Sequence, residues 1–162
     1  MIVADAGPII AFARIRRLDL LRSVVGELVI PDAVYEELVQ KGPSRRPGAT
    51  EVEQSSWIQK MAVMDRTALI QLPFHLHLGE REAIILAQEI DTQLLIDESR
   101  GRRVAREKGL EVYGSLRILI EAKPQGLIAK VRPVIQNMLD AGYWIDEALI
   151  RSLLQETGET RT

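Results

Sequence analysis

Short apolar runs alternate with amphipathic stretches along most of this chain. The runs end at polar or turn-forming residues, as buried strands do, and the stretches between them repeat apolar positions every three to four residues, as helices do. Predicted strands cover 1–4, 28–30, 93–97 and 110–114, and predicted helices cover 8–21, 33–40, 79–90, 99–108 and 115–123. Strands that alternate with helices of about ten residues predict βαβ units and a mainly parallel sheet, and therefore an α/β fold.

The middle of the chain is harder to interpret. Residues 41–47, KGPSRRP, consist of helix breakers and charged residues, and they predict a loop. Within 50–78, the pattern is compatible with a helix over 51–60 and with a strand over 58–64.

The end of the chain follows a different pattern. After Pro124-Gln125-Gly126 only helical periodicity is found, over 127–139 and 144–156. We therefore expect an α/β domain over residues 1–126. We expect residues 127–162 to form a C-terminal helical hairpin that packs on the same domain or on a partner.

Two carboxylates follow apolar strands directly. Asp5 ends the first predicted strand and Asp97 ends the strand QLLID. In an open parallel sheet, ligands gather beyond the carboxyl ends of the strands, so these two acids are candidates for one site. The alternative is that each acid only caps the helix that follows it.

Helical geometry adds a third candidate, Glu37. On the helix 33–40, Glu37 falls within the apolar arc and Glu36 falls in the polar gap, provided that Ala33 is counted as buried. The alternative is a surface ion pair between Glu37 and Lys41, one helical turn later.

The helix 79–90 adds a fourth candidate, Glu80, on the same face as Ala83, Ile84 and Ala87. Glu82 is expected further toward the polar side of this helix. Glu80 could also act only as a first-turn acid that complements the helix dipole.

Four carboxylates around one cleft repel each other and require a cation. The chain has no cysteine, which excludes thiolate zinc sites and disulfides and fits a reducing cytoplasm. Oxygen ligands alone suit Mg²⁺ or Mn²⁺, the ions that support hydrolysis of phosphate esters and phosphodiesters.

At these positions the chain resembles the PIN-domain nucleases. The resemblance rests on DAGPIIAFARI, IPDAVYEEL, LGEREAIILA and LLIDESRGRRVAREKGLEVYGS, in this order, and it continues to the final GLIAKVRPVIQNMLDAGYWIDEALIRSLLQETGE. More narrowly, the chain is similar to a prokaryotic PIN-like branch of predicted nucleic-acid-binding proteins. The resemblance implies a three-layer α/β/α sandwich on a parallel sheet, and an acidic cluster that binds Mg²⁺ or Mn²⁺ and hydrolyses RNA, as in toxins of the VapC type.

Carried over to this chain, the family's acids fall on Asp5, Glu37 and Glu80, and the fourth on either Asp97 or Glu98. Typical VapC toxins differ from this chain in two ways. The third acid here is a glutamate, and Ile96 stands where the fourth motif usually has a threonine. Ser115 either supplies a hydroxyl near the site or caps its helix.

The charge of the chain adds a candidate nucleic-acid-binding surface. The formal net charge is -2, so any such surface must be local. The residues just after Asp97 are rich in arginine and could hold phosphates, or they could form an ordinary solvated helix face. These candidates are Arg100, Arg102, Arg103 and Arg106. Aromatic residues make up 4% of the chain, so we do not expect an extended base-stacking platform.

The sequence thus favours a Mg²⁺- or Mn²⁺-dependent endoribonuclease, and the resemblance implies the toxin of a toxin–antitoxin pair. The alternative is a catalytically weak PIN-like protein that binds nucleic acid or another partner through its arginines. RNA, an antitoxin protein and a second copy of the chain are the expected partners. A membrane is not expected, because no apolar run approaches the ~20 residues of a membrane-spanning helix.

Overall fold

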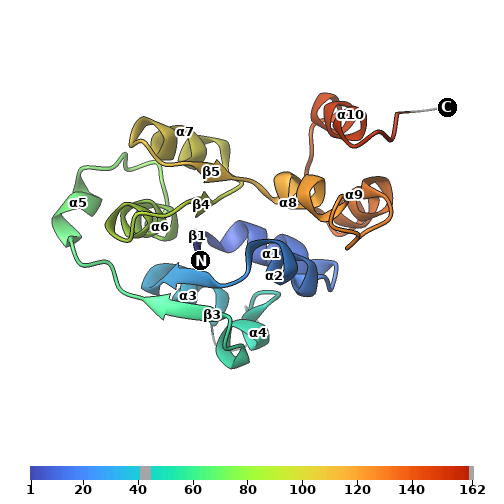
Figure 1. The fold of residues 1–162 in the computed structure, drawn as a ribbon. Coiled ribbons are helices and arrows are strands. Elements are labelled where there is room, and N and C mark those ends of the chain that lie inside the picture. Colours follow the sequence, from blue (N-terminus) through green and yellow to red (C-terminus); the bar gives the residue numbers. More distant parts are fainter. Residues whose placement is uncertain (41–44, 161–162) are drawn as a thin grey trace.

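A computed structural model describes residues 1–40 and 45–160, and its centre is one parallel sheet of five strands (Figure 1). The strands are β1 (Ile2–Ala4), β2 (Leu28–Pro31), β3 (Ile58–Met61), β4 (Leu94–Leu95) and β5 (Val112–Tyr113). Their order is β3-β2-β1-β4-β5, and every neighbouring pair is parallel. The predicted α/β fold with a parallel sheet is confirmed.

Side chains of the strands alternate between two buried layers. Ile2, Ala4 and Leu28 lie in a hydrophobic cluster on one face, whereas Val3 and Val29 lie in a second cluster on the other. Since successive residues of a strand point to opposite faces, both faces of the sheet are covered. The predicted three-layer α/β/α arrangement is therefore present.

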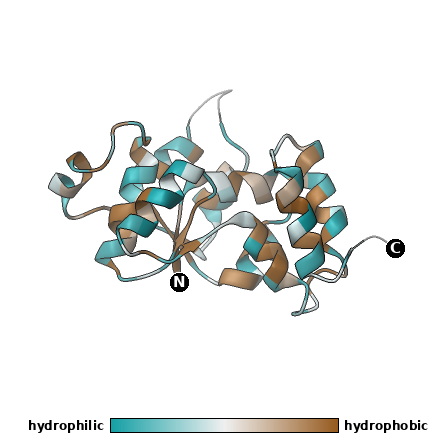
Figure 2. Ribbon diagram, turned by 90° about the horizontal axis from the view of Figure 1, so that it is seen from above, coloured by the Kyte–Doolittle hydropathy of each residue, from teal (hydrophilic) through white to brown (hydrophobic). Residues whose placement is uncertain are grey.

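Different helices cover the two faces, as Figure 1 shows. The first cluster packs under α1 (Ala6–Arg14), α2 (Leu18–Val25) and α8 (Ser115–Ala122). The second packs under α5 (Arg66–Ile70), α6 (Leu78–Glu89) and α7 (Ser99–Glu107). In Figure 2 the helices carry both hydrophilic and hydrophobic residues, consistent with one buried and one solvated face.

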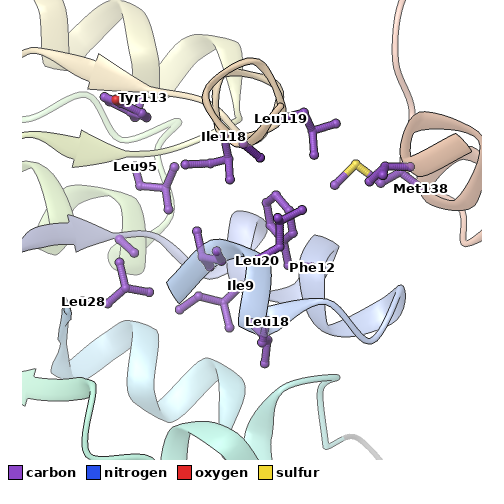
Figure 3. Close-up of a cluster of buried hydrophobic side chains, with 14 of the residues drawn as sticks. Ile9, Phe12, Leu18, Leu20, Leu28, Leu95, Tyr113, Ile118, Leu119 and Met138 are labelled. Atoms are coloured by element: carbon purple, nitrogen blue, oxygen red, sulfur yellow. The ribbon is translucent and has the colours of Figure 1, made fainter. Parts of the chain in front are cut away.

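The single helix predicted over 8–21 is wrong, because the chain turns between α1 and α2. Arg16 adopts a left-handed backbone conformation with φ of 57°. This turn allows Phe12 from α1 and Leu20 from α2 to enter the same cluster (Figure 3). Arginine rarely adopts a left-handed conformation, so the hydrophobic periodicity does not indicate that the helix ends here.

The segment 50–78 contains both kinds of element that its pattern allowed, each shorter than expected. The helix α4 (Ala49–Gln54) ends before Trp57 and Ile58, which enter the core, and β3 follows as an edge strand. Next to α4, Arg45 forms an ion pair with Glu53. Of the predicted loop 41–47, residues 41–44 lie outside the described residues.

The last helices, α9 (Val131–Asp140) and α10 (Glu147–Glu156), lie beyond α8 (Figure 1). Met138 of α9 points toward Leu119 of α8 and Phe12 of α1 in the hydrophobic cluster (Figure 3). Both helices begin later than the predicted 127 and 144. Of the residues that the structure describes, none forms a helix long and apolar enough to cross a membrane.

Candidate active site

The sheet has one topological switch point, between β1 and β4. From β1 the chain continues to β2 and β3 on one side, and it later returns to place β4 and β5 on the other. Binding sites of open α/β sheets lie at such a point, outside the carboxyl ends of the strands. A cavity of about 370 Å³ lies here. Its lining consists of Asp5, Ala6, Gly7, Ile10, Glu37, His77, Glu80, Asp97, Glu98, Tyr143 and Trp144.

Asp5 lies at the base of this cavity, at the end of β1. Its backbone N–H donates to the carbonyl oxygen of Leu95 in β4, which fixes it at the switch point. The side chain is 8% exposed and does not cap α1, so the capping alternative fails for this residue. Burial, together with the negative charges of Glu80, Glu37 and Asp97, raises the pKa of Asp5 to about 7.

Glu37 enters the cavity from α3 (Asp32–Leu38), where it is half-buried while its neighbour Glu36 is exposed. The first turn of α6 brings Gly79 against it. A Cβ atom at Gly79 would lie 3.4 Å from Glu37 Oε2 and 3.7 Å from Asp5 Oδ1. The two carboxylates thus flank the same point of the backbone. Lys41, the alternative partner of Glu37, lies outside the described residues.

Glu80 occupies the first turn of α6 and is 8% exposed. Its Oε2 accepts a hydrogen bond from the backbone N–H of His77, 3.3 Å away, as part of a capping box. Burial, followed by the charge of Glu98, raises the pKa of Glu80. Glu80 therefore stabilises the start of its helix and also lines the acidic cavity.

Asp97 and Glu98 follow β4 and have different partners. Asp97 accepts hydrogen bonds from the Ser115 backbone N–H at 2.7 Å and from the Ser115 hydroxyl at 2.6 Å. Glu98 accepts from the backbone N–H of Gly101 at 2.8 Å and caps α7. The capping role considered for Asp97 thus belongs to Glu98, although both residues line the cavity.

Ser115 does not cap α8, because it is the first residue inside that helix and is fully buried. Its hydroxyl and backbone N–H both hold the carboxylate of Asp97. Of the two roles considered for Ser115, the structure supports the hydroxyl near the site.

The arginines of α7 differ in their placement. Arg102 is half-buried, and its guanidinium donates to the carbonyl oxygen of Ile96 at 3.2 Å, beside Asp97. A Cβ at Gly114 would overlap this guanidinium, so a larger residue there would require Arg102 to move. The other three candidates, Arg100, Arg103 and Arg106, are exposed and do not line the cavity.

Three ring-bearing lining residues were not predicted as site residues: His77, Tyr143 and Trp144. Tyr143 and Trp144 come from the connection between α9 and α10, which therefore reaches the carboxyl ends of the strands. Burial and the charge of Asp97 raise the pKa of Tyr143. No local pattern marks these two residues, because only the packing of α9 brings them to the switch point.

The expected solvated position of Glu82 is wrong. This residue is 2% exposed, and its carboxylate accepts from the Ala33 backbone N–H and from Arg66, each at 2.7 Å. Glu82 thus connects the start of α3 with α5. Both helices pack on α6, and the hydrophobic periodicity of α6 does not indicate this packing. Glu82 is absent from the lining of the acidic cavity.

The donor set of the cavity suits a hard divalent cation. It offers carboxylate oxygens, and burial of their charges is unfavourable unless a cation compensates it. Within residues 1–40 and 45–160, Asp5, Glu80 and Asp97 form no ion pair with a basic side chain. Among the same residues, no three acidic or histidine side chains converge closely enough to hold an ion by themselves. Water would therefore have to complete the coordination, as Mg²⁺ usually requires.

Comparison with known proteins agrees with this fold. A family model described as a PIN domain matches residues 1–159. A solved structure of a PilT N-terminus domain protein from the hyperthermophilic archaeon Sulfolobus solfataricus aligns with a TM-score of 0.53 at 12% sequence identity. The alignment covers 91% of this chain and 98% of that protein. No functionally curated protein matches this chain.

Proposed function

Because the chain belongs to the PIN-domain family, we propose that it is an endoribonuclease that uses Mg²⁺ or Mn²⁺ to hydrolyse RNA phosphodiester bonds. The observation that carries this proposal is the gathering of five carboxylates around one cavity at the switch point. PIN domains are generally nucleases that use divalent metal ions, and an acidic cavity at this position is what such chemistry requires.

In this proposal Asp5, Glu37, Glu80 and Asp97 hold the divalent ion, directly or through water. When bound, the ion supplies a more acidic water and neutralises the charge that develops at phosphorus. Ser115 holds Asp97 in one orientation through two hydrogen bonds. Glu98 adds negative charge next to Glu80 while its hydrogen bond to Gly101 keeps the start of α7 in place.

The positive charges needed to hold RNA are supplied by α7. Arg102 is fixed beside Asp97 and is the arginine placed to contact a phosphate next to the acidic cavity. Weaker contacts to more distant phosphates are assigned to three exposed arginines of the same helix: Arg100, Arg103 and Arg106.

A toxin role in a toxin–antitoxin pair remains part of the proposal, with the antitoxin as a protein partner and the cytoplasm as the place of action. A small open reading frame directly upstream that encodes an antitoxin-like protein would support this role. The competing function is RNA binding without cleavage, in which the arginines are needed and the carboxylates are not.

The decisive experiment incubates the purified chain with labelled single-stranded RNA and Mn²⁺. Cleavage by the unmodified protein, lost in Asp5→Asn and Glu37→Gln, supports the proposal. Glu36→Gln is the matched control, because Glu36 is the exposed neighbour of Glu37 and its variant should cleave normally. RNA binding without metal-dependent cleavage would reject the nuclease and leave the binding protein.

A further inference from the structure

Trp144 is the most exposed large hydrophobic residue next to the acidic cavity. Its side chain is 81% exposed, although the residues on either side are anchored: Ile145 is buried in the core and Tyr143 is half-buried at the cavity. The indole is therefore presented to solvent from a held backbone. Single exposed apolar residues are common on protein surfaces. Trp144 differs from most of them because it lines the acidic cavity.

The chain's other tryptophan provides a contrast. Trp57 is 8% exposed, belongs to the core, and lies under the guanidinium of Arg22. Trp57 is thus explained by packing. Trp144, in contrast, contributes little buried area to the fold, and because it lines the acidic cavity it is available to a ligand bound there.

The location of Trp144 indicates what this ligand is. The acidic cavity, of about 370 Å³, opens next to a groove of about 600 Å³ that runs between α7, α8 and α10. Asp97, Glu98, Tyr143 and Trp144 line both spaces, so Trp144 stands at the boundary between them. A chain molecule with one phosphate at the carboxylates would continue past Trp144 into this groove.

The groove that Trp144 lines also has a cation in its lining. Arg102 lines it, and the same guanidinium lies near Asp97 and Tyr143. The boundary thus combines an aromatic face, a guanidinium and a set of carboxylates. A nucleotide of a polymer carries matching groups, namely a flat base and a phosphate.

We propose that Trp144 stacks on a base of single-stranded RNA, next to the phosphodiester that lies at the carboxylates, while Arg102 contacts the neighbouring phosphate. This inference rests on the proposed function and specifies its substrate. The strand must be single, because the bases of a duplex are stacked on each other and offer no free face to an indole. Stacking of this kind accepts any base, so it favours unpaired RNA without selecting a sequence.

Fluorescence tests the inference directly, because Trp57→Phe leaves Trp144 as the chain's sole tryptophan. This variant is titrated, in Ca²⁺ to neutralise the carboxylates without supporting cleavage, with a single-stranded oligouridylate, with an abasic strand of equal length, and with a duplex of equal length. We expect the emission of Trp144 to be quenched by the oligouridylate and to change little with the abasic strand or the duplex. Equal quenching by all three would overturn the proposal.

Affinity measurements test it without the Trp57 substitution. Trp144→Ala should weaken binding of the oligouridylate about 5- to 100-fold. Trp144→Phe should recover much of this loss and Trp144→Leu should not, because leucine is apolar but cannot stack. The matched control is Phe74→Ala, since Phe74 is 85% exposed and is absent from the lining of both spaces. Unchanged affinity in Trp144→Ala, or absence of any RNA binding, rejects the inference.

The stacking proposal and the nuclease proposal can fail separately. If the protein cleaves RNA, Trp144→Ala should raise KM more than it lowers kcat, and an unchanged KM would overturn stacking while the nuclease remains. If the protein never cleaves, Trp144-dependent binding in Ca²⁺ still supports stacking. Emission that depends on protein concentration but not on RNA would show that a second copy covers Trp144, and this too would reject the inference.

Discussion

Glu80 and Glu82 lie two positions apart on α6, both are buried, and their carboxylates serve different parts of the molecule. Glu80 faces the acidic cavity and approaches Asp5, Glu37 and Glu98. Glu82 bonds instead to the start of α3 and to Arg66 of α5. The carboxylate of Glu80 therefore lies in an unfavourable cluster of like charges, whereas the carboxylate of Glu82 has hydrogen-bond partners that stabilise the fold.

This difference predicts opposite effects of the same substitution. Glu82→Gln should lower the free energy of unfolding by about 1–3 kcal/mol, because it weakens two hydrogen bonds of a buried charged group. Glu80→Gln should lower it by no more than about 0.5 kcal/mol, or raise it, because the substitution removes a repelling charge. Urea denaturation at pH 7 in EDTA measures both values.

The variants Glu80→Gln and Glu82→Gln also serve as a test and a control for metal binding. Mn²⁺ should raise the melting temperature of Glu82→Gln about as much as that of the unmodified protein, and should raise that of Glu80→Gln much less. If both variants respond to Mn²⁺ equally, Glu80 is not a ligand.

Most of the sheet and four of the acids could be identified from local signals in the sequence, whereas Glu98 came only from the family resemblance. Asp5 and Asp97 each end an apolar run, and Glu37 and Glu80 share a helix face with apolar residues. Parallel strands place their carboxyl ends at one edge, so residues that are distant in sequence can be assigned to one location. The roles of these acids in metal binding and catalysis remain predictions.

The remaining features depend on contacts that no periodicity encodes. Glu82 is buried because α3 and α5 cover it, and its position on the helix alone suggests a solvated residue. Tyr143 and Trp144 reach the site because α9 and α10 fold back across α8. In each case the deciding partner is distant in sequence, and the local pattern is the same with or without it.

Asp5→Asn should stabilise the metal-free protein at high pH. The folded-state pKa of Asp5 is about 7, against an ordinary value of 3.8, so its contribution to stability is fully present below pH 3.8 and is lost as the pH rises through 7. At pH 8 in EDTA we expect the variant to be about 2–4 kcal/mol more stable than the unmodified protein, and at pH 4 about equal. Urea denaturation at both pH values measures this.

The same variant should lose its response to Mn²⁺, because its amide cannot supply the missing charge. A stabilised protein that no longer binds the ion would show that Asp5 is retained for function at the expense of stability. Equal stability of the two proteins at pH 8 would contradict the burial of a repelled charge.

Ser115→Ala should impair the site more than the fold. The substitution removes the hydroxyl that donates to Asp97 but keeps the backbone N–H that also donates to it. We expect a loss of about 1 kcal/mol in unfolding free energy and a decrease of about 10- to 100-fold in Mn²⁺ affinity or cleavage rate. Ser56→Ala, at an exposed serine that lines neither the cavity nor the groove, should change neither. A Ser115→Ala protein with full Mn²⁺ affinity would show that Asp97 does not need this support.

Glu159 should make the attachment of the last helices sensitive to acid. Its carboxylate accepts hydrogen bonds from the backbone N–H groups of Val131 and Arg132 and from the ammonium group of Lys123. Burial of the carboxylate raises its pKa, but these hydrogen bonds outweigh burial and lower the pKa to about 2. Glu159 thus joins the end of α8, the start of α9 and the residues after α10. Since the folded-state pKa is below the ordinary 4.5, the stabilisation is complete above pH 4.5 and is lost as the pH falls through 2.

Glu159→Gln should therefore lower the unfolding free energy by about 1–2 kcal/mol at pH 7, a value reduced for solvent screening, and by progressively less toward pH 2. Comparing the unmodified protein with Glu159→Gln by urea denaturation at each pH isolates the effect of Glu159 from that of the other carboxylates. The control is Glu156→Gln, at an exposed position of α10, which should unfold with the same free energy as the unmodified protein at each pH. Hydrogen exchange should be faster at the first backbone N–H groups of α9 in the variant. Because α9 also leads into Tyr143 and Trp144, a loosened attachment should weaken oligouridylate binding as well. A difference between the proteins that stays constant from pH 7 to pH 2 would show that the charge of Glu159 does not hold this junction.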